Sequence, residues 1–175
     1  MGQKPLRPGL LALWLVGLAA LGTAAVLLLR SPLGRLYARA TQRSTMADMR
    51  AWDRALAAYI ADHGAAPPSP NGEVTFKKPL VSLLLPYLER LRTADWWVSR
   101  YLIWTVEGEE ESGLPRTSPR DYIIISRGKG GQREVWRFDP AAPEAGLYRS
   151  RAENEYERDL ILWNGRPVRW PKMGR

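Results

Sequence analysis

The residues best suited to chemistry are four cations that lie close together in the second half of the chain: Arg127, Lys129, Arg133 and Arg137. Such side chains bind phosphate groups, so the four form a candidate basic face for nucleic acid. Basic charge alone gives only weak, salt-dependent binding, and a run of cations is more often a solvated surface. We therefore predict that nucleic acid is not the partner of this chain.

No catalytic constellation accompanies these cations. The 175 residues include no cysteine and one histidine, His63, which excludes a thiol nucleophile, a cysteine-based metal site and a multi-histidine metal site. Residues 128–131 read Gly-Lys-Gly-Gly, but no predicted helix follows them, as a phosphate-binding loop requires, so they are interpreted as a turn. The acidic run at residues 109–111 is interpreted as a solvated loop. The sequence predicts no enzyme active site.

A membrane segment is the clearest element in the chain. Residues 10–29 contain no charged side chain. Twenty residues of helix reach about 30 Å, the thickness of a bilayer core. A cleaved secretory signal is the alternative, but the apolar run is long for a signal and Arg30 follows it at once. We predict a transmembrane helix over residues 10–29, preceded by a short basic cytoplasmic leader over residues 1–9 and followed by a soluble domain over residues 30–175.

The soluble part begins with a predicted amphipathic helix over residues 33–62. Apolar side chains recur in it at helical spacing, at Met49, Trp52, Leu56 and Tyr59, and predict a face for core or subunit packing. A glycine at position 64 and two following prolines predict where this helix ends. A second, shorter helix is predicted over residues 80–91, with a proline at position 86 that interrupts it.

Three strands are predicted after the helices, over residues 101–106, 121–126 and 159–163. The Asn-Gly pair that follows the last of them predicts a two-residue hairpin turn. In such a hairpin Trp163 pairs with Arg166 and Ile161 pairs with Val168. Pro167 cannot donate a backbone hydrogen bond, so its strand is predicted at a sheet edge. The expected fold is α+β, with the long helix packed on a small antiparallel sheet.

The order of these elements is similar to that of a known family. Residues 47–68 contain Ala-Asp-Met, a tyrosine, Asp-His-Gly and Pro-Pro, residues 95–97 read Asp-Trp-Trp, and residues 121–128 end in Ser-Arg-Gly. The terminal Asp-Leu-Ile-Leu, Asn-Gly and Trp-Pro segments complete the pattern. Together these motifs resemble type II secretion pseudopilins of the protein G kind, over most of residues 45–171. The resemblance implies a pilin-like fold in which the membrane helix extends into the long amphipathic helix.

The N-terminus departs from the pilin pattern. Pilin precursors have a basic leader, a glycine and then an apolar helix with glutamate as its fifth residue. Gly9 and Leu10 are the candidate positions for leader processing, but Trp14 replaces the glutamate and Pro8 replaces the usual basic residue. The family also implies calcium, bound through aspartates in a C-terminal loop. Here the corresponding loop is cationic, which disfavours calcium, and Asp139 and Asp159 are the nearest candidate ligands. We expect no cofactor.

The resemblance implies a structural role that depends on subunit packing and not on catalysis. The first hypothesis is a component of a type II secretion or type IV pilus-related machine. Its partners would be the membrane, other pseudopilins or secretion-machine proteins, and further copies of the chain. The alternative is a membrane-anchored binding module such as a DNA-uptake minor pilin that uses the basic face. The resemblance places the protein in the bacterial inner membrane with its C-terminal domain in the periplasm, although arginines after the apolar run favour the opposite orientation.

Overall fold

The fold was determined from a computed structural model, which describes residues 14, 17–19, 23, 32–88, 90, 92–105, 113–115, 117–149 and 153–172. The chain divides into two units, residues 1–39 and 40–175. The predicted leader, its processing positions Gly9 and Leu10, and most of the predicted membrane helix lie outside the described residues. Within the described ranges, no helix combines the length and the apolar character needed to cross a membrane.

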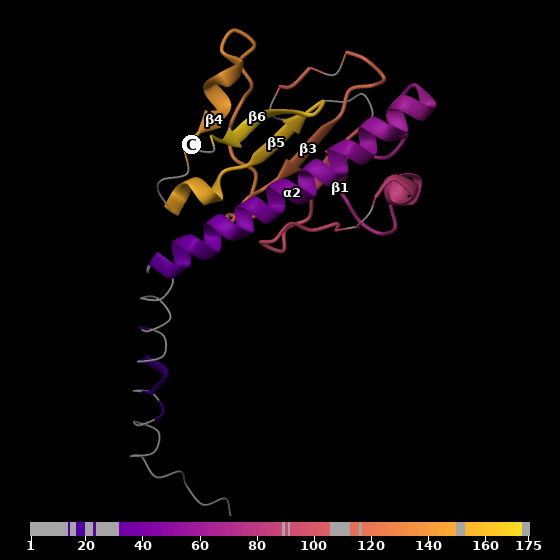
Figure 1. Cartoon of the computed structure of the whole chain (residues 1–175). Helices are drawn as coiled ribbons and strands as arrows, with labels where there is room; N and C mark the ends of the chain where they lie inside the picture. Colours follow the sequence, from indigo (N-terminus) through magenta and orange to yellow (C-terminus); the bar gives the residue numbers. More distant parts are fainter. Residues whose placement is uncertain are drawn as a thin grey trace, which may run out of the picture. The chain divides into compact units, whose positions relative to one another are not determined.

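The long predicted helix is present as α2, Pro32–His63. It ends where the sequence predicts, because Gly64 adopts a left-handed φ of 79° and its N–H donates to the Ile60 carbonyl over 2.8 Å. His63 stacks on Tyr59 with 4.0 Å between ring centroids, and its Nδ1 lies 3.0 Å from the Tyr59 carbonyl oxygen. In the second unit, α2 crosses one face of the sheet (Figure 1).

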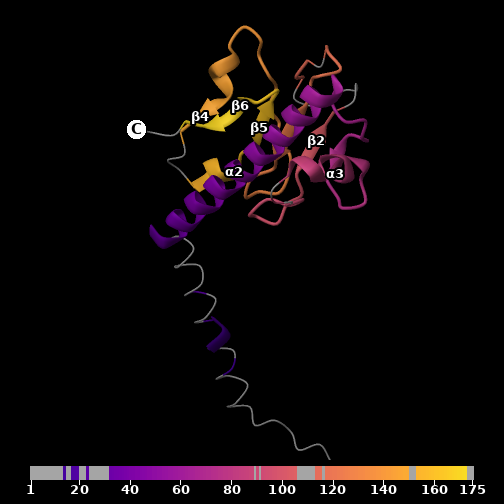
Figure 2. The ribbon, with the colours of Figure 1, turned by 45° about the vertical axis from the view of Figure 1, so that its right-hand side comes forward.

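The second predicted helix is shorter than expected. It consists of α3, Pro79–Leu84, and a single 3₁₀ turn, η1, Leu85–Tyr87. Pro86 lies in η1, and since proline has no N–H and crowds the preceding turn, the α-helix does not continue past it. The predicted continuation of the helix is therefore wrong at Leu88 and Arg90, and residues 89 and 91 lie outside the described residues. Tyr87 donates from its hydroxyl to Asp62 over 2.8 Å, which holds this segment beside the end of α2 (Figure 2).

In the part of the chain that the structure describes, six strands form one sheet in the order β1-β2-β3-β5-β6-β4. The three predicted strands are present but shorter, as β2, Leu102–Trp104, β3, Ile123–Ser126, and β5, Leu160–Trp163. β6, Arg166–Pro171, completes the hairpin. Two strands of two residues each were not predicted, β1, Gly72–Glu73, and β4, Leu147–Tyr148. The expectation of a small antiparallel sheet is wrong at one place, because β4 pairs with β6 in parallel.

The hairpin turn is confirmed, since Asn164 and Gly165 have φ values of 47° and 76°. Trp163 pairs with Arg166 as expected. The next expected pair is wrong: Ile161 faces Arg169, because a register shift leaves Val168 as an extra residue in β6. Pro167 precedes this bulge and offers no donor to a regular ladder. Its strand is not at the edge along its whole length, because β4 pairs with the last two residues of β6.

Both faces of the sheet are buried. On the α2 side, a core forms around Met49, Trp52, Leu56 and Tyr59, each at most 7% exposed, and it includes Ile124 of β3. On the opposite side, a second core contains these buried residues: Leu102, Leu114, Ile123, Ile125, Ile161 and Val168. The unbroken apolar run of β3 therefore has a direct cause, since alternate residues enter different cores.

Candidate functional site

The four candidate basic residues do not form one open cationic surface. Arg127 donates from Nη2 to Glu73 over 3.0 Å, and Arg133 forms an ion pair with Asp159. The side chains of these two arginines are 22% and 17% exposed. Lys129 and Arg137 lie exposed on the surface. Arg127 and Arg133 of the predicted binding face thus hold segments of the domain together.

Asp159 is a buried residue directly before β5, and its carboxylate binds two groups of the segment at residues 133–134. Its Oδ2 accepts from Arg133 and from the Glu134 N–H, the latter over 3.1 Å. Its Oδ1 has no hydrogen-bond partner among the described residues, and the residue is 1% exposed. Burial raises the pKa of Asp159 to about 6, and the nearby Arg133 guanidinium limits this rise.

This raised pKa predicts a stability that falls as pH rises. The unfolded carboxyl ionises near 3.8 and the folded one near 6, so between these values the folded state binds more protons. The stabilising contribution of Asp159 is fully present below pH 3.8 and is lost as pH rises through 6. The unfolding free energy should fall by up to about 3 kcal/mol over this range. Urea unfolding at several pH values measures it. The Asp159→Asn variant should show a shallower slope, and the slope that remains should come in part from Asp95 and Asp48, whose pKa values burial also raises.

The two candidate calcium ligands have different roles. Asp139 is exposed and accepts the N–H of Ala141 over 2.9 Å, an ordinary turn contact. Asp159 is buried and faces an arginine. Within the described ranges, no three histidine, aspartate or glutamate side chains are grouped closely enough to hold a metal ion.

A buried aspartate that the residue types did not single out organises the segment before β2. Asp95 is 1% exposed, and its Oδ1 accepts the N–H groups of Trp97 and Ser99, both over 2.9 Å. Its Oδ2 accepts the Ser126 hydroxyl over 2.7 Å. Ser126 is itself fully buried at the end of β3, so this Ser–Asp pair has no access to a substrate. The Asp95–Ser126 hydrogen bond holds the Asp-Trp-Trp turn against the sheet. In the sequence, only the resemblance to the family motif at residues 95–97 drew attention to this aspartate.

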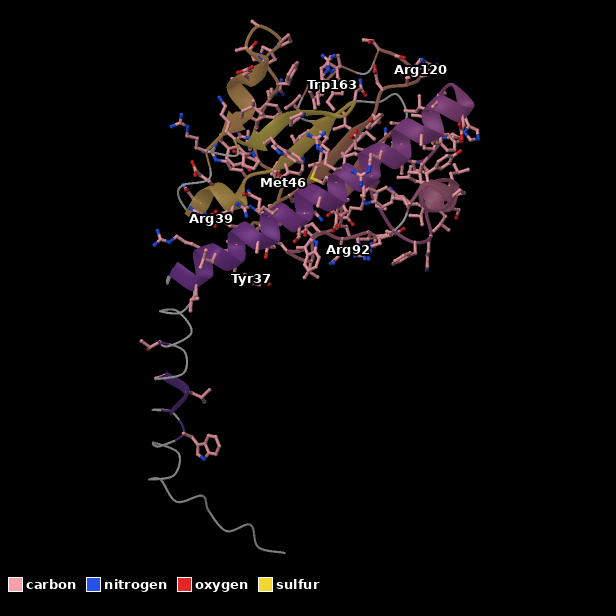
Figure 3. All side chains as sticks on the ribbon, in the orientation of Figure 1. Tyr37, Arg39, Met46, Arg92, Arg120 and Trp163 are labelled. Carbon is pink, nitrogen blue, oxygen red and sulfur yellow. The ribbon has the colours of Figure 1, made fainter. Side chains whose placement is uncertain are left out.

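The same turn is fastened to α2 by a second aspartate. Trp96 donates from Nε1 to Asp48 over 2.9 Å, and its backbone N–H donates to the Thr45 hydroxyl over 3.2 Å. The Arg92 guanidinium lies 4.0 Å from the centre of the Trp96 ring and 3.5 Å from Asp48. Figure 3 shows Arg92 beside the helix. Burial raises the pKa of Asp48, against the opposing effect of Arg92.

Val98 lies at the tip of this turn in a strained conformation. Its φ is 70°, in the left-handed region that β-branched residues avoid, and its side chain is 85% exposed. We predict that Val98→Gly raises the unfolding free energy by about 1 kcal/mol, because relief of roughly 1–2 kcal/mol of strain exceeds the entropic cost of glycine. Urea unfolding measures the change. Val98→Ala, which keeps a Cβ, should give a smaller gain, and a loss in the glycine variant would show that the valine side chain is needed.

A second ion pair, between the buried Arg169 and the partly exposed Glu134, was also not predicted from sequence. Arg169 of β6 is 5% exposed and donates from Nε to Glu134 over 3.0 Å and from Nη1 to the Gly146 carbonyl over 3.3 Å. Its guanidinium lies 5.6 Å from the Trp136 ring and 5.3 Å from the Tyr148 ring. The residue type of Arg169 gives no sign that β4 and the segment before β4 cover its side chain. The pair fixes this corner of the domain.

The buried polar groups described above hold elements together, and the candidate surface for packing against a partner is the outward side of α2. Within residues 40–63 its outward side is built of small and charged side chains, among them the exposed residues Ala47, Arg54, Ala58 and Ala61. Small side chains allow another helix to approach closely. No protein-family model, curated protein or solved structure matches the chain.

Proposed function

We propose that this chain is a membrane-anchored, pilin-like assembly subunit of a bacterial type II secretion or type IV pilus-related machine. One observation carries the proposal. In the sequence, a 20-residue uncharged segment at residues 10–29 precedes α2. The C-terminal half of α2 packs on a mainly antiparallel sheet through its Met49–Tyr59 side. A protein of this kind acts by holding a domain at the membrane and by packing against neighbours.

The outward side of α2 supports packing as the mode of action. Inward-facing large residues are all used in the core, whereas exposed alanines at positions 47, 58 and 61 form the side available to another helix. The pairing of Arg127 with Glu73 and of Arg133 with Asp159 leaves fewer cations for a phosphate backbone, so the nucleic-acid alternative receives no support.

The first test concerns the membrane. We expect the full chain to stay with membranes after carbonate and high-salt extraction and to need detergent for release. A reporter that is active only in the periplasm, fused after residue 175, should be active. Release of the intact protein without detergent would overturn the anchor. A silent periplasmic reporter with an active cytoplasmic one would overturn the proposed orientation.

The second test concerns packing, and the absence of native cysteine makes it direct. Ala47→Cys and Ala58→Cys, treated in native membranes with a short bismaleimide, should give specific adducts with other copies or with a neighbouring protein. Ala141→Cys is the matched exposed control away from α2, and Ala55→Cys, at a fully buried position, reports background. Equal adducts from positions 47, 58 and 141 would indicate random collision and contradict the proposal.

A further inference from the structure

The positive charge of this protein is concentrated at its N-terminal end. The chain carries 26 lysines and arginines against 18 acidic residues, a net charge of +8. The first acidic residue is Asp48, so residues 1–47 contain six of the cations and no anion. The remaining 128 residues contain 20 cations and 18 anions and are nearly balanced. Four of the six N-terminal cations follow the apolar segment within 14 residues: Arg30, Arg35, Arg39 and Arg43.

The first turns of α2 combine these cations with exposed apolar side chains. Leu33, Leu36 and Tyr37 are 66%, 59% and 70% exposed. Arg35 and Arg39 are four residues apart, which places them on one side of the helix, and both are exposed. Figure 3 shows the Tyr37 and Arg39 side chains extending away from the helix. Leucine, tyrosine and arginine side by side are typical of helices at the level of lipid headgroups.

We infer that the first turns of α2 bind anionic phospholipid headgroups at the membrane surface, through Arg35 and Arg39, with Leu33, Leu36 and Tyr37 in the boundary region below the headgroups. The inference rests on the proposed membrane anchor, because residues 10–29 bring this helix start to the bilayer surface. An anionic membrane is complementary both to the arginines and to the apolar side chains.

Other occupants fit this surface less well. A second copy would bring Arg35 and Arg39 against identical cations, and like charges at close range repel. A nucleic acid would attract the positively charged arginines but would leave the two leucines and the tyrosine without an apolar environment. A lipid surface matches both the charge of the arginines and the apolar character of the other side chains, since it has anionic headgroups directly above hydrocarbon.

The inference is tested with the full chain reconstituted in two kinds of vesicle, phosphatidylcholine alone and phosphatidylcholine with phosphatidylglycerol. Ala40→Cys supplies an exposed reporter thiol next to the proposed contact. We expect a water-soluble maleimide to react with it more slowly in the anionic vesicles, and high salt to remove the difference. Each arginine near an anionic surface is expected to change local partitioning about fivefold, so two account for roughly 25-fold.

The decisive variant is Arg35→Gln with Arg39→Gln, which should make the thiol react in anionic vesicles as it does in neutral ones. Arg149→Gln with Arg166→Gln changes the net charge equally at exposed positions elsewhere and should leave the slow reaction unchanged. If the Ala40→Cys protein that keeps Arg35 and Arg39 reacts at equal rates in both kinds of vesicle, the inference is overturned. Slow reaction that depends on protein density at fixed lipid composition would assign the surface to a second copy instead.

Flotation separates the two claims. If the chain floats with both kinds of vesicle and shows no dependence on lipid charge, the anchor stands and the headgroup contact is wrong. If the chain floats with neither, the proposed anchor fails, and the inference that rests on it fails as well.

Discussion

Replacement of Trp52 by alanine should lower the unfolding free energy by about 3–5 kcal/mol, the range found when buried tryptophan or phenylalanine is truncated. Trp52 is 1% exposed and lies between Met49 and Leu56 in the core that joins α2 to the sheet. Its Nε1 also donates to the Arg92 carbonyl over 3.0 Å. Alanine therefore creates a cavity and leaves a carbonyl without its donor.

The measurement is urea unfolding of the full chain in mild detergent, followed by near-ultraviolet circular dichroism. Trp52→Phe is the matched control, because it keeps most of the ring volume and loses the hydrogen bond. It should cost less than alanine, about 1–3 kcal/mol. If Trp52→Ala unfolds at the same urea concentration as the unaltered chain, α2 does not pack on the sheet as described.

Replacement of Gly128 by alanine is the second change with a large expected cost. Gly128 has a φ of 59°, and an added Cβ would lie 2.4 Å from the Arg158 carbonyl oxygen and 2.8 Å from the Tyr156 carbonyl oxygen. Both obstacles are backbone atoms, which cannot move aside as a flexible side chain does. Left-handed strain of roughly 1–2 kcal/mol and overpacking of about 1–3 kcal/mol together predict a loss of about 2–5 kcal/mol.

The matched control for Gly128→Ala lies two residues away. At Gly130 an added Cβ has its nearest contact at 3.4 Å, to the Glu157 carbonyl oxygen, and its φ is not in the left-handed region. Gly130→Ala should change the unfolding free energy by less than about 1 kcal/mol. Thermal and urea unfolding of the two variants measure the contrast. Equal effects would mean that the turn over residues 128–131 is not packed against residues 156–158.

The features that depend only on residues close together in the sequence were predicted well. The end of α2 at Gly64 follows from a glycine that can adopt positive φ, and the turn at Asn164 and Gly165 follows from the same physics. The Met49–Tyr59 side of α2 follows from helical periodicity, which requires no knowledge of the rest of the fold. In each case the cause lies within a few residues.

The roles of the charged residues could not be predicted in this way. Arg133 and Asp159 are 26 positions apart, and Glu134 and Arg169 are 35 positions apart. Residue type alone suggested that Arg133 is a surface cation and that Asp159 is a candidate metal ligand, whereas the fold pairs a partly buried Arg133 with a buried Asp159. The strand order and the paths of the loops decide which charged side chains form ion pairs, and no local sequence pattern predicts these pairs.

The sequence by itself determined the uncharged segment at residues 10–29, the apolar side of α2, the main strands and the hairpin turn, because each depends on local spacing and on backbone preference. Only the tertiary structure decided the bulge at Val168, the parallel pairing of β4 with β6, and the arginine–carboxylate pairs that consume part of the basic face. These features depend on contacts between distant segments, whose geometry exists only once the chain has folded.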